Sequence, residues 1–105
     1  MLDITTAAKE DWFVVSVRGR ADTLTADDLE SALVAAAEGN SQIAVDLSAL
    51  DYISSAGLRA LLQGARAAQI RNVTFAVCAS SPPVKKVMEM SGLDRVLRMQ
   101  GELPC

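Results

Sequence analysis

The chain has 105 residues, of which half are hydrophobic, and a net charge of −3. A chain of this length and composition can bury its own hydrophobic core, so we expect one domain over residues 1–105. The negative net charge and the scattered basic residues argue against nucleic acid as a partner.

The first part of the chain predicts two strands and a helix. Residues 12–19 are rich in β-branched and aromatic residues and end at a glycine, which is typical of a strand. Residues 1–7 form a candidate partner strand, joined to it by a hairpin at residues 8–11. Residues 24–40 predict a helix that begins with Thr25 as its cap and stops at a Gly-Asn pair.

The middle of the chain predicts a parallel crossover of strand, helix and strand. Residues 43–47 and 73–79 are almost continuously apolar, as expected of strands that are covered on both faces. Between them, apolar residues recur at helical spacing, at Leu58, Leu61, Leu62 and Ala65. We expect Asp46 at the end of its strand and Asp51 in a turn.

The last part predicts one more helix and an edge strand. Residues 81–92 begin with a pair of prolines and end at Gly92, which suits a helix. Residues 95–99 are a candidate for a short strand at the edge of the sheet. The order of the elements predicts an α/β fold.

Cysteine usage and the ends of the chain favour a cytoplasmic protein. Cys78 lies in an apolar run and Cys105 is the last residue, a spacing that fits neither a disulfide framework nor a metal site. The first residues lack the pattern of a signal peptide, and no apolar run is long enough to cross a bilayer. We therefore expect no metal, no cofactor and no direct insertion into a membrane.

Two adjacent serines and a glycine stand where the middle helix begins. One serine is explained as an N-cap, a role worth about 1 kcal/mol, but the second is not. Gly57 costs up to about 1 kcal/mol in a first helical turn and leaves the backbone uncovered. Such a helix start can receive an approaching surface or hold a phosphate.

The sequence contains few of the residues that a catalytic site would need. The chain has no histidine, so a Ser-His-Asp triad cannot form, and only a pair of a serine with Lys85 or Lys86 remains open. Asp22, Asp46 and Asp51 are more simply explained by local hydrogen bonding, least securely for Asp22. Because phosphate-loop and dinucleotide motifs are also absent, we do not expect an enzyme.

Residues 45–62 and 73–97, together with the Gly-Arg-Ala-Asp sequence at 19–22, resemble the STAS domain of bacterial anti-sigma factor antagonists. The resemblance covers nearly the whole chain. It implies a small α/β domain with a mixed sheet of four or five strands and helices mainly on one side.

The resemblance also implies a function as a phosphorylation switch. Its acceptor is Ser55, modified by a partner that is both a serine kinase and an anti-sigma factor or related switch protein. Many members have Asp just before the acceptor, where this chain has Ser54, the alternative site. The unmodified protein is expected to bind and sequester the kinase, the phosphorylated one to release it, and a cognate serine phosphatase to reset the switch.

The expected contact surface surrounds this helix start. It comprises Asp22, Thr23, Asp51, Tyr52, Ser54, Gly57, Leu58, Arg59, Ser80 and Ser81. The alternative function is a STAS-type structural subunit of a membrane transport or lipid-trafficking ATPase complex, which would need no phosphate on Ser55. A small-molecule or nucleotide sensor is a third possibility, disfavoured by the lack of a phosphate loop.

Overall fold

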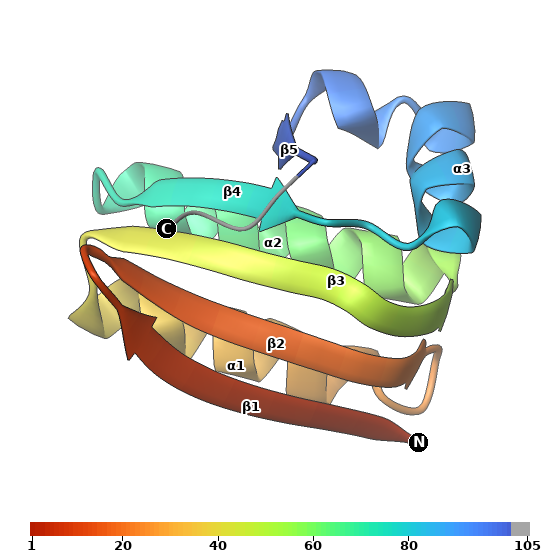
Figure 1. Cartoon of the computed structure of the whole chain (residues 1–105), viewed down its shortest axis with the longest axis horizontal. Helices are drawn as coiled ribbons and strands as arrows, with labels where there is room; N and C mark the ends of the chain where they lie inside the picture. The colour runs from red at the N-terminus through yellow and green to blue at the C-terminus, as the bar shows by residue number, and fades with distance from the viewer. Residues whose placement is uncertain (102–105) are drawn as a thin grey trace.

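The structure is a computed structural model that describes residues 1–101. A five-stranded sheet in the order β1-β2-β3-β4-β5 forms its centre (Figure 1). β1 pairs with β2 antiparallel, and the other neighbours pair parallel. The expected mixed sheet, the first hairpin and the parallel crossover are therefore confirmed. The strands are β1 (Leu2–Lys9), β2 (Trp12–Ala21), β3 (Gln42–Ile53), β4 (Thr74–Cys78) and β5 (Arg98–Gln100).

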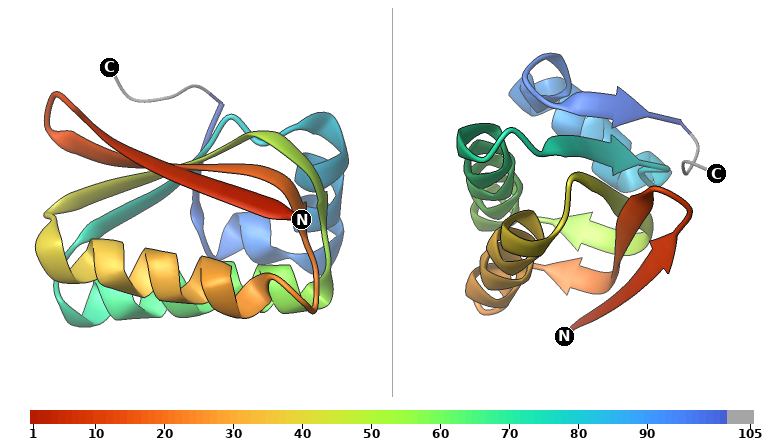
Figure 2. Two further views of the ribbon diagram at one scale, coloured as in Figure 1. Left: turned by 90° about the horizontal axis from the view of Figure 1, so that it is seen from below. Right: turned by 90° about the vertical axis from the view of Figure 1, so that its left-hand side faces the viewer.

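Two long helices cover one face of this sheet (Figure 2). These are α1 (Ala26–Gly39) and α2 (Ser55–Ile70), which lie side by side. A third helix, α3 (Pro82–Ser91), adds Val84 and Met88 to the same buried cluster. The helices thus share one core with one face of the sheet, as expected.

The two long helices pack closely because α2 has a glycine, Gly64, where it faces α1. A Cβ added to Gly64 would lie 2.7 Å from Leu33 Cβ. The predicted buried face of α2 was partly wrong, since Leu62 and Ala65 are only half-buried while Ala60 and Ala68 are buried. The helix contacts both the sheet and α1, so it buries small residues as well as large ones. The spacing of large apolar residues alone does not predict that second buried face.

β3 extends six residues past the predicted end of its strand. Its pairing with β4 stops at Asp46, but its pairing with β2 continues to Ile53 through two register shifts. The expected strand end at Asp46 and the expected turn at Asp51 are therefore wrong, since both residues lie within β3. The shifts break the alternation of buried and exposed residues, which hid this half of the strand.

The end of the chain differs from the prediction in its details. Gly92 terminates α3 in the left-handed conformation, with φ of 80°, as expected of a glycine C-cap. The edge strand begins only at Arg98, because Leu93–Arg95 form a short 3-10 helix, η1. The expectation for Cys105 lies outside the described residues.

Candidate functional site

Ser54 links the end of β3 to the start of α2. Its backbone N–H donates to the carbonyl of Ala21 at 2.8 Å, which ties the ends of β2 and β3 together. Its backbone is extended, and its Oγ accepts a hydrogen bond from the N–H of Gly57 at 3.3 Å. Its carbonyl accepts from the N–H of Leu58 at 2.9 Å. Ser54 is therefore the N-cap, and its hydroxyl already has a structural use.

Ser55 differs from its neighbour in its exposure and in the use of its hydroxyl. It is the first residue of α2 and it is exposed. Its hydroxyl forms no hydrogen bond with any residue in the part of the chain that the structure describes. An exposed hydroxyl at a helix N-terminus is accessible to another protein, and nothing in the described structure must be broken to modify it.

Gly57 has a packing role that the sequence interpretation missed. It is buried, and an added Cβ would lie 2.7 Å from Ile53 Cγ1 and 2.9 Å from the carbonyl oxygen of Ala21. The idea that this glycine leaves the backbone uncovered is therefore wrong. Gly57 lets the first turn of α2 rest on the ends of β2 and β3, which fixes the position of Ser55. Leu58 is also buried, at 9 % exposure.

The loop from β2 to α1 is held by Asp22 and Thr25. Asp22 Oδ1 accepts from the N–H groups of Leu24 and Thr25 at 3.0 and 3.2 Å, and Thr25 Oγ1 accepts from the N–H of Asp22 at 2.9 Å. Thr25 is the N-cap residue of α1, as predicted, but its side chain makes no capping hydrogen bond. Although desolvation works to raise the pKa of Asp22, hydrogen bonds from the Thr25 side chain and from both N–H groups hold it below its ordinary value.

A groove of about 390 Å³ separates the starts of α1 and α2. The expected residues Thr23 and Arg59 meet in its lining, and Ala56 places it directly beside Ser55. Asp27 and Glu30 from α1 also line it and were not predicted as contact residues, since Asp27 in the first turn is sufficiently explained by the helix dipole. The groove therefore offers a partner acidic groups from α1 and one basic group from α2.

Two large side chains are exposed near Ser55, one beside the expected contact surface and one within it. Leu24, in the loop that Asp22 holds, is 91 % exposed and was missed because a single leucine near a helix start carries no signal. Tyr52 is 40 % exposed, and the Arg20 guanidinium lies 4.2 Å from the centre of its ring. Arg20 and Tyr52 are opposite each other on β2 and β3, and Asp51 is exposed beside them.

Ser80 and Ser81 lie in the loop between β4 and α3. Ser81 Oγ donates to the carbonyl of Leu50, and its N–H donates to the carbonyl of Leu47 at 3.3 Å. Ser80 Oγ is buried and has no partner among the described residues. Both side chains face the protein more than the solvent, so their contact with a partner stays a prediction.

The serine–lysine pair that the sequence left open does not form among the described residues. Lys85 and Lys86 are exposed on α3 and pair with no serine among residues 1–101. Desolvation, reinforced by the charge of Asp46, raises the pKa of the buried Cys78 thiol, which keeps it protonated. Within the described residues, no three His, Cys, Asp or Glu side chains could hold a metal ion, and no helix is both long and apolar enough to cross a membrane.

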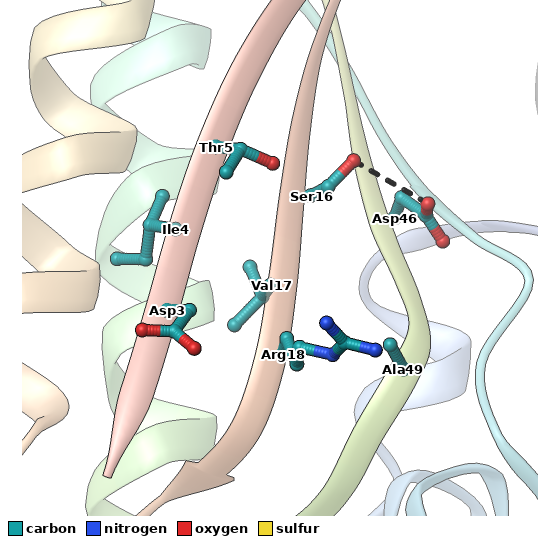
Figure 3. A pocket seen from close by; sticks show the side chains of 8 residues that line it. All are labelled: Asp3, Ile4, Thr5, Ser16, Val17, Arg18, Asp46 and Ala49. Carbon is teal, nitrogen blue, oxygen red and sulfur yellow. Dashed lines mark hydrogen bonds between the residues drawn. The ribbon is translucent and has the colours of Figure 1, made fainter.

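A second hollow, of about 450 Å³, lies on β1, β2 and β3 (Figure 3). The side chains of Asp3, Thr5, Ser16, Arg18 and Asp46 line it. Ser16 Oγ donates to Asp46 Oδ2 at 3.4 Å. None of the expected contact residues lines this hollow, so it is separate from the helix start at Ser55.

Comparison with known proteins identifies the family. A family model described as "Mlab, STAS domain" matches residues 4–100. The chain belongs to the STAS-domain family. The five-stranded mixed sheet agrees with this assignment, and Ser54, Ser55 and Gly57 occupy the strand-to-helix junction of the STAS domain.

Relatives of this STAS domain share a regulatory description. BtrV of Bordetella bronchiseptica, named as an anti-sigma factor antagonist, is 38 % identical over 75 % of this chain and 69 % of that protein. The anti-sigma-F factor antagonist RsfB of Mycobacterium tuberculosis is 30 % identical over 93 % of this chain and 80 % of that protein. The crystal structure of an anti-sigma factor antagonist from Mycobacterium paratuberculosis has a TM-score of 0.88 and 28 % identity, covering 98 % of this chain and 88 % of the other.

Proposed function

We propose that this STAS domain is a regulatory binding protein that phosphorylation of Ser55 switches. The unmodified protein binds and sequesters an anti-sigma factor or related switch protein that is also a serine kinase. Phosphorylation of Ser55 by that kinase releases it, and a cognate phosphatase restores the binding form. The observation that carries this proposal is that the Ser55 hydroxyl is exposed and bonds to none of residues 1–101, whereas the hydroxyl of Ser54 is used as a cap.

The proposed role asks for no catalytic group in this chain. In phosphoryl transfer the kinase supplies the nucleotide, the metal ions and the residue that accepts the hydroxyl proton. The substrate protein must present an accessible hydroxyl in a fixed place. The Ser54 cap and the close packing of Gly57 on Ala21 and Ile53 give Ser55 that fixed place.

The switch follows from the charge that the phosphate adds. Phosphoserine carries nearly two negative charges at pH 7, and a helix N-terminus stabilises them within the domain. The groove beside Ser55 already contains Asp27 and Glu30, so the phosphate makes an acidic surface more acidic. A partner that places acidic or apolar atoms over Ser55 loses affinity through repulsion and desolvation of the dianion.

The first experiment uses Ser55→Ala and Ser55→Asp as paired baits for proteins in a native lysate. We expect the Ala form alone to retain a kinase, which is identified by mass spectrometry. The purified kinase and ATP should then modify the wild type at Ser55. Ser54→Asp is the matched control, because Asp preserves an N-cap while removing the neighbouring hydroxyl. A kinase that modifies Ser55→Ala but not Ser54→Asp would assign the acceptor to Ser54 and contradict the proposal.

A second candidate stays open because the matching family model is named for Mlab and not for an antagonist. It is a structural subunit of a membrane transport or lipid-trafficking ATPase complex. Stable capture of the same ATPase by both Ser55 baits would favour it, since a structural subunit has no need of a switch at this residue.

A further inference from the structure

The outer edge of β1 has no strand paired to it within residues 1–101, because β1 is the first strand in the sheet order (Figure 1). Residues 5–8 are exposed and read Thr-Thr-Ala-Ala, without a charge or a proline. Natural edge strands are usually protected by charged residues, proline or bulges. In β1, charges occur only toward the two ends, at Asp3 and Lys9.

The pairing of β1 with β2 fixes which backbone groups point outward. Lys9 pairs with Trp12 across a two-residue turn, so this closing pair is hydrogen-bonded. At the other end the N–H of Arg20 donates to the carbonyl of Met1 at 2.9 Å, which follows the same alternation. Odd-numbered residues of β1 therefore bond to β2, and the N–H and C=O groups of even-numbered residues point away from the sheet.

The outward groups of β1 are complementary to those of a second β1. Two copies related by a two-fold axis through Thr6 would place Thr6 opposite Thr6 and Ile4 opposite Ala8, all with outward backbone groups. The same register places Asp3 opposite Lys9 of the second copy, and Lys9 opposite Asp3. These are non-hydrogen-bonded positions, at which facing side chains approach most closely.

Other antiparallel registers lose this complementarity. A one-residue slip would oppose outward groups to groups already bonded to β2. A two-residue slip would set Asp3 against either Ala7 or Asp11 of the second copy. On the inner side, Asp3 pairs in register with Arg18 of its own chain, but the Arg18 guanidinium points away from it toward Ala49 (Figure 3). Asp3 forms no ion pair with any of residues 1–101, so its carboxylate is available to Lys9 of the second copy.

From this geometry we infer that the chain forms a two-fold symmetric dimer in which the β1 edges of two copies pair antiparallel, with Thr6 at the axis. The dimer joins two five-stranded sheets into one of ten strands. It is isologous, because each copy contributes the same residues to the interface. The interface is the outer edge of β1, so the dimer is independent of the proposed switch at Ser55.

Charge reversal at the two ends of β1 tests the register. Asp3→Lys places Lys against Lys9 of the second copy, and Lys9→Asp places Asp against Asp3. We expect the wild type to approach twice the monomer mass in sedimentation equilibrium at low salt. Each reversal alone should remain monomeric, and an equimolar mixture of the two should dimerise, since every facing pair is then of opposite charge.

Two further variants separate the interface from the fold. Thr6→Pro removes an outward N–H that β2 does not use, so it should abolish dimerisation while circular dichroism shows a folded chain. Lys86→Asp, a reversal on exposed α3, should dimerise like the wild type. A wild type that stays monomeric at millimolar concentration overturns the inference. So does a dimer that survives Thr6→Pro, or reversal variants that fold but do not associate when mixed.

Discussion

α1 and α2 begin at the same end of the sheet, after the carboxyl ends of β2 and β3, but their first turns are stabilised in different ways. α2 is capped by the Ser54 side chain, so the next hydroxyl, on Ser55, is left unbonded among the described residues. α1 has no side-chain cap, and the polar atoms of Asp22 and Thr25 bond to each other and to the Arg20 carbonyl of β2. That loop presents the exposed Leu24. One helix start thus presents an exposed hydroxyl and the other an exposed apolar side chain.

The largest effect should come from the packing that supports α2. Gly57→Ala places a methyl group against Ile53 and the backbone oxygen of Ala21, and overpacking of this kind costs about 1–3 kcal/mol. Gly39→Ala is the matched control, because beyond its chain neighbours and its own helix backbone its added Cβ would meet no described atom within 4 Å. Urea denaturation should show a loss of stability for the first variant and no loss for the second. Equal stability of the two would contradict the close packing of Gly57.

The apolar contact of the α1 start should matter for binding and not for folding. Leu24→Ala removes a side chain that is 91 % exposed, so the free energy of unfolding should change by less than about 0.5 kcal/mol. If Leu24 lies in the interface with the proposed kinase, its loss should weaken binding by roughly tenfold, about 1.4 kcal/mol. Calorimetric titration of the captured kinase gives this value. Unchanged affinity would remove Leu24 from the contact surface.

The difference between the two serines can be measured as stability. Ser54→Ala should cost about 1 kcal/mol because the N–H of Gly57 loses its acceptor. Ser54→Asp should retain most of that stability. Ser55→Ala should be nearly neutral, since its hydroxyl bonds to no described residue. Thermal denaturation of the three variants would contradict the assignment if Ser55→Ala proved the most destabilised.

The sequence predicted the strands well where buried apolar residues run almost continuously, as in the first half of β3 and in β4. It failed in the second half of β3, because two register shifts break the alternation that marks a strand. It also did not show why Gly57 and Gly64 must be glycines, because the atoms that leave no room for a side chain there belong to Ile53 and Leu33 on other elements.

The candidate site was likewise predictable in part from the local sequence and in part only from tertiary contacts. The motif around Ser54 and Ser55 located the site, but which hydroxyl caps the helix depends on backbone geometry. The acidic side of the groove required knowing that the starts of α1 and α2 are neighbours. Local signals thus found the helix start, and tertiary contacts decided what each residue does there.

The smallest effect concerns the polar network of the α1 start and appears only as a dependence on pH. Because hydrogen bonds from Thr25 and two N–H groups lower the pKa of Asp22 in the folded state, folding is favoured when this carboxylate is charged. The contribution is fully present above the unfolded-state pKa of about 4, and it is lost as the pH falls through the lower folded-state pKa. Asp22→Asn lacks this titration, so its stability relative to the wild type should improve as the solution is acidified. Denaturant midpoints measured for both proteins from neutral pH into the acid range test this. A constant difference between them would mean that the Asp22 charge does not contribute to holding the loop.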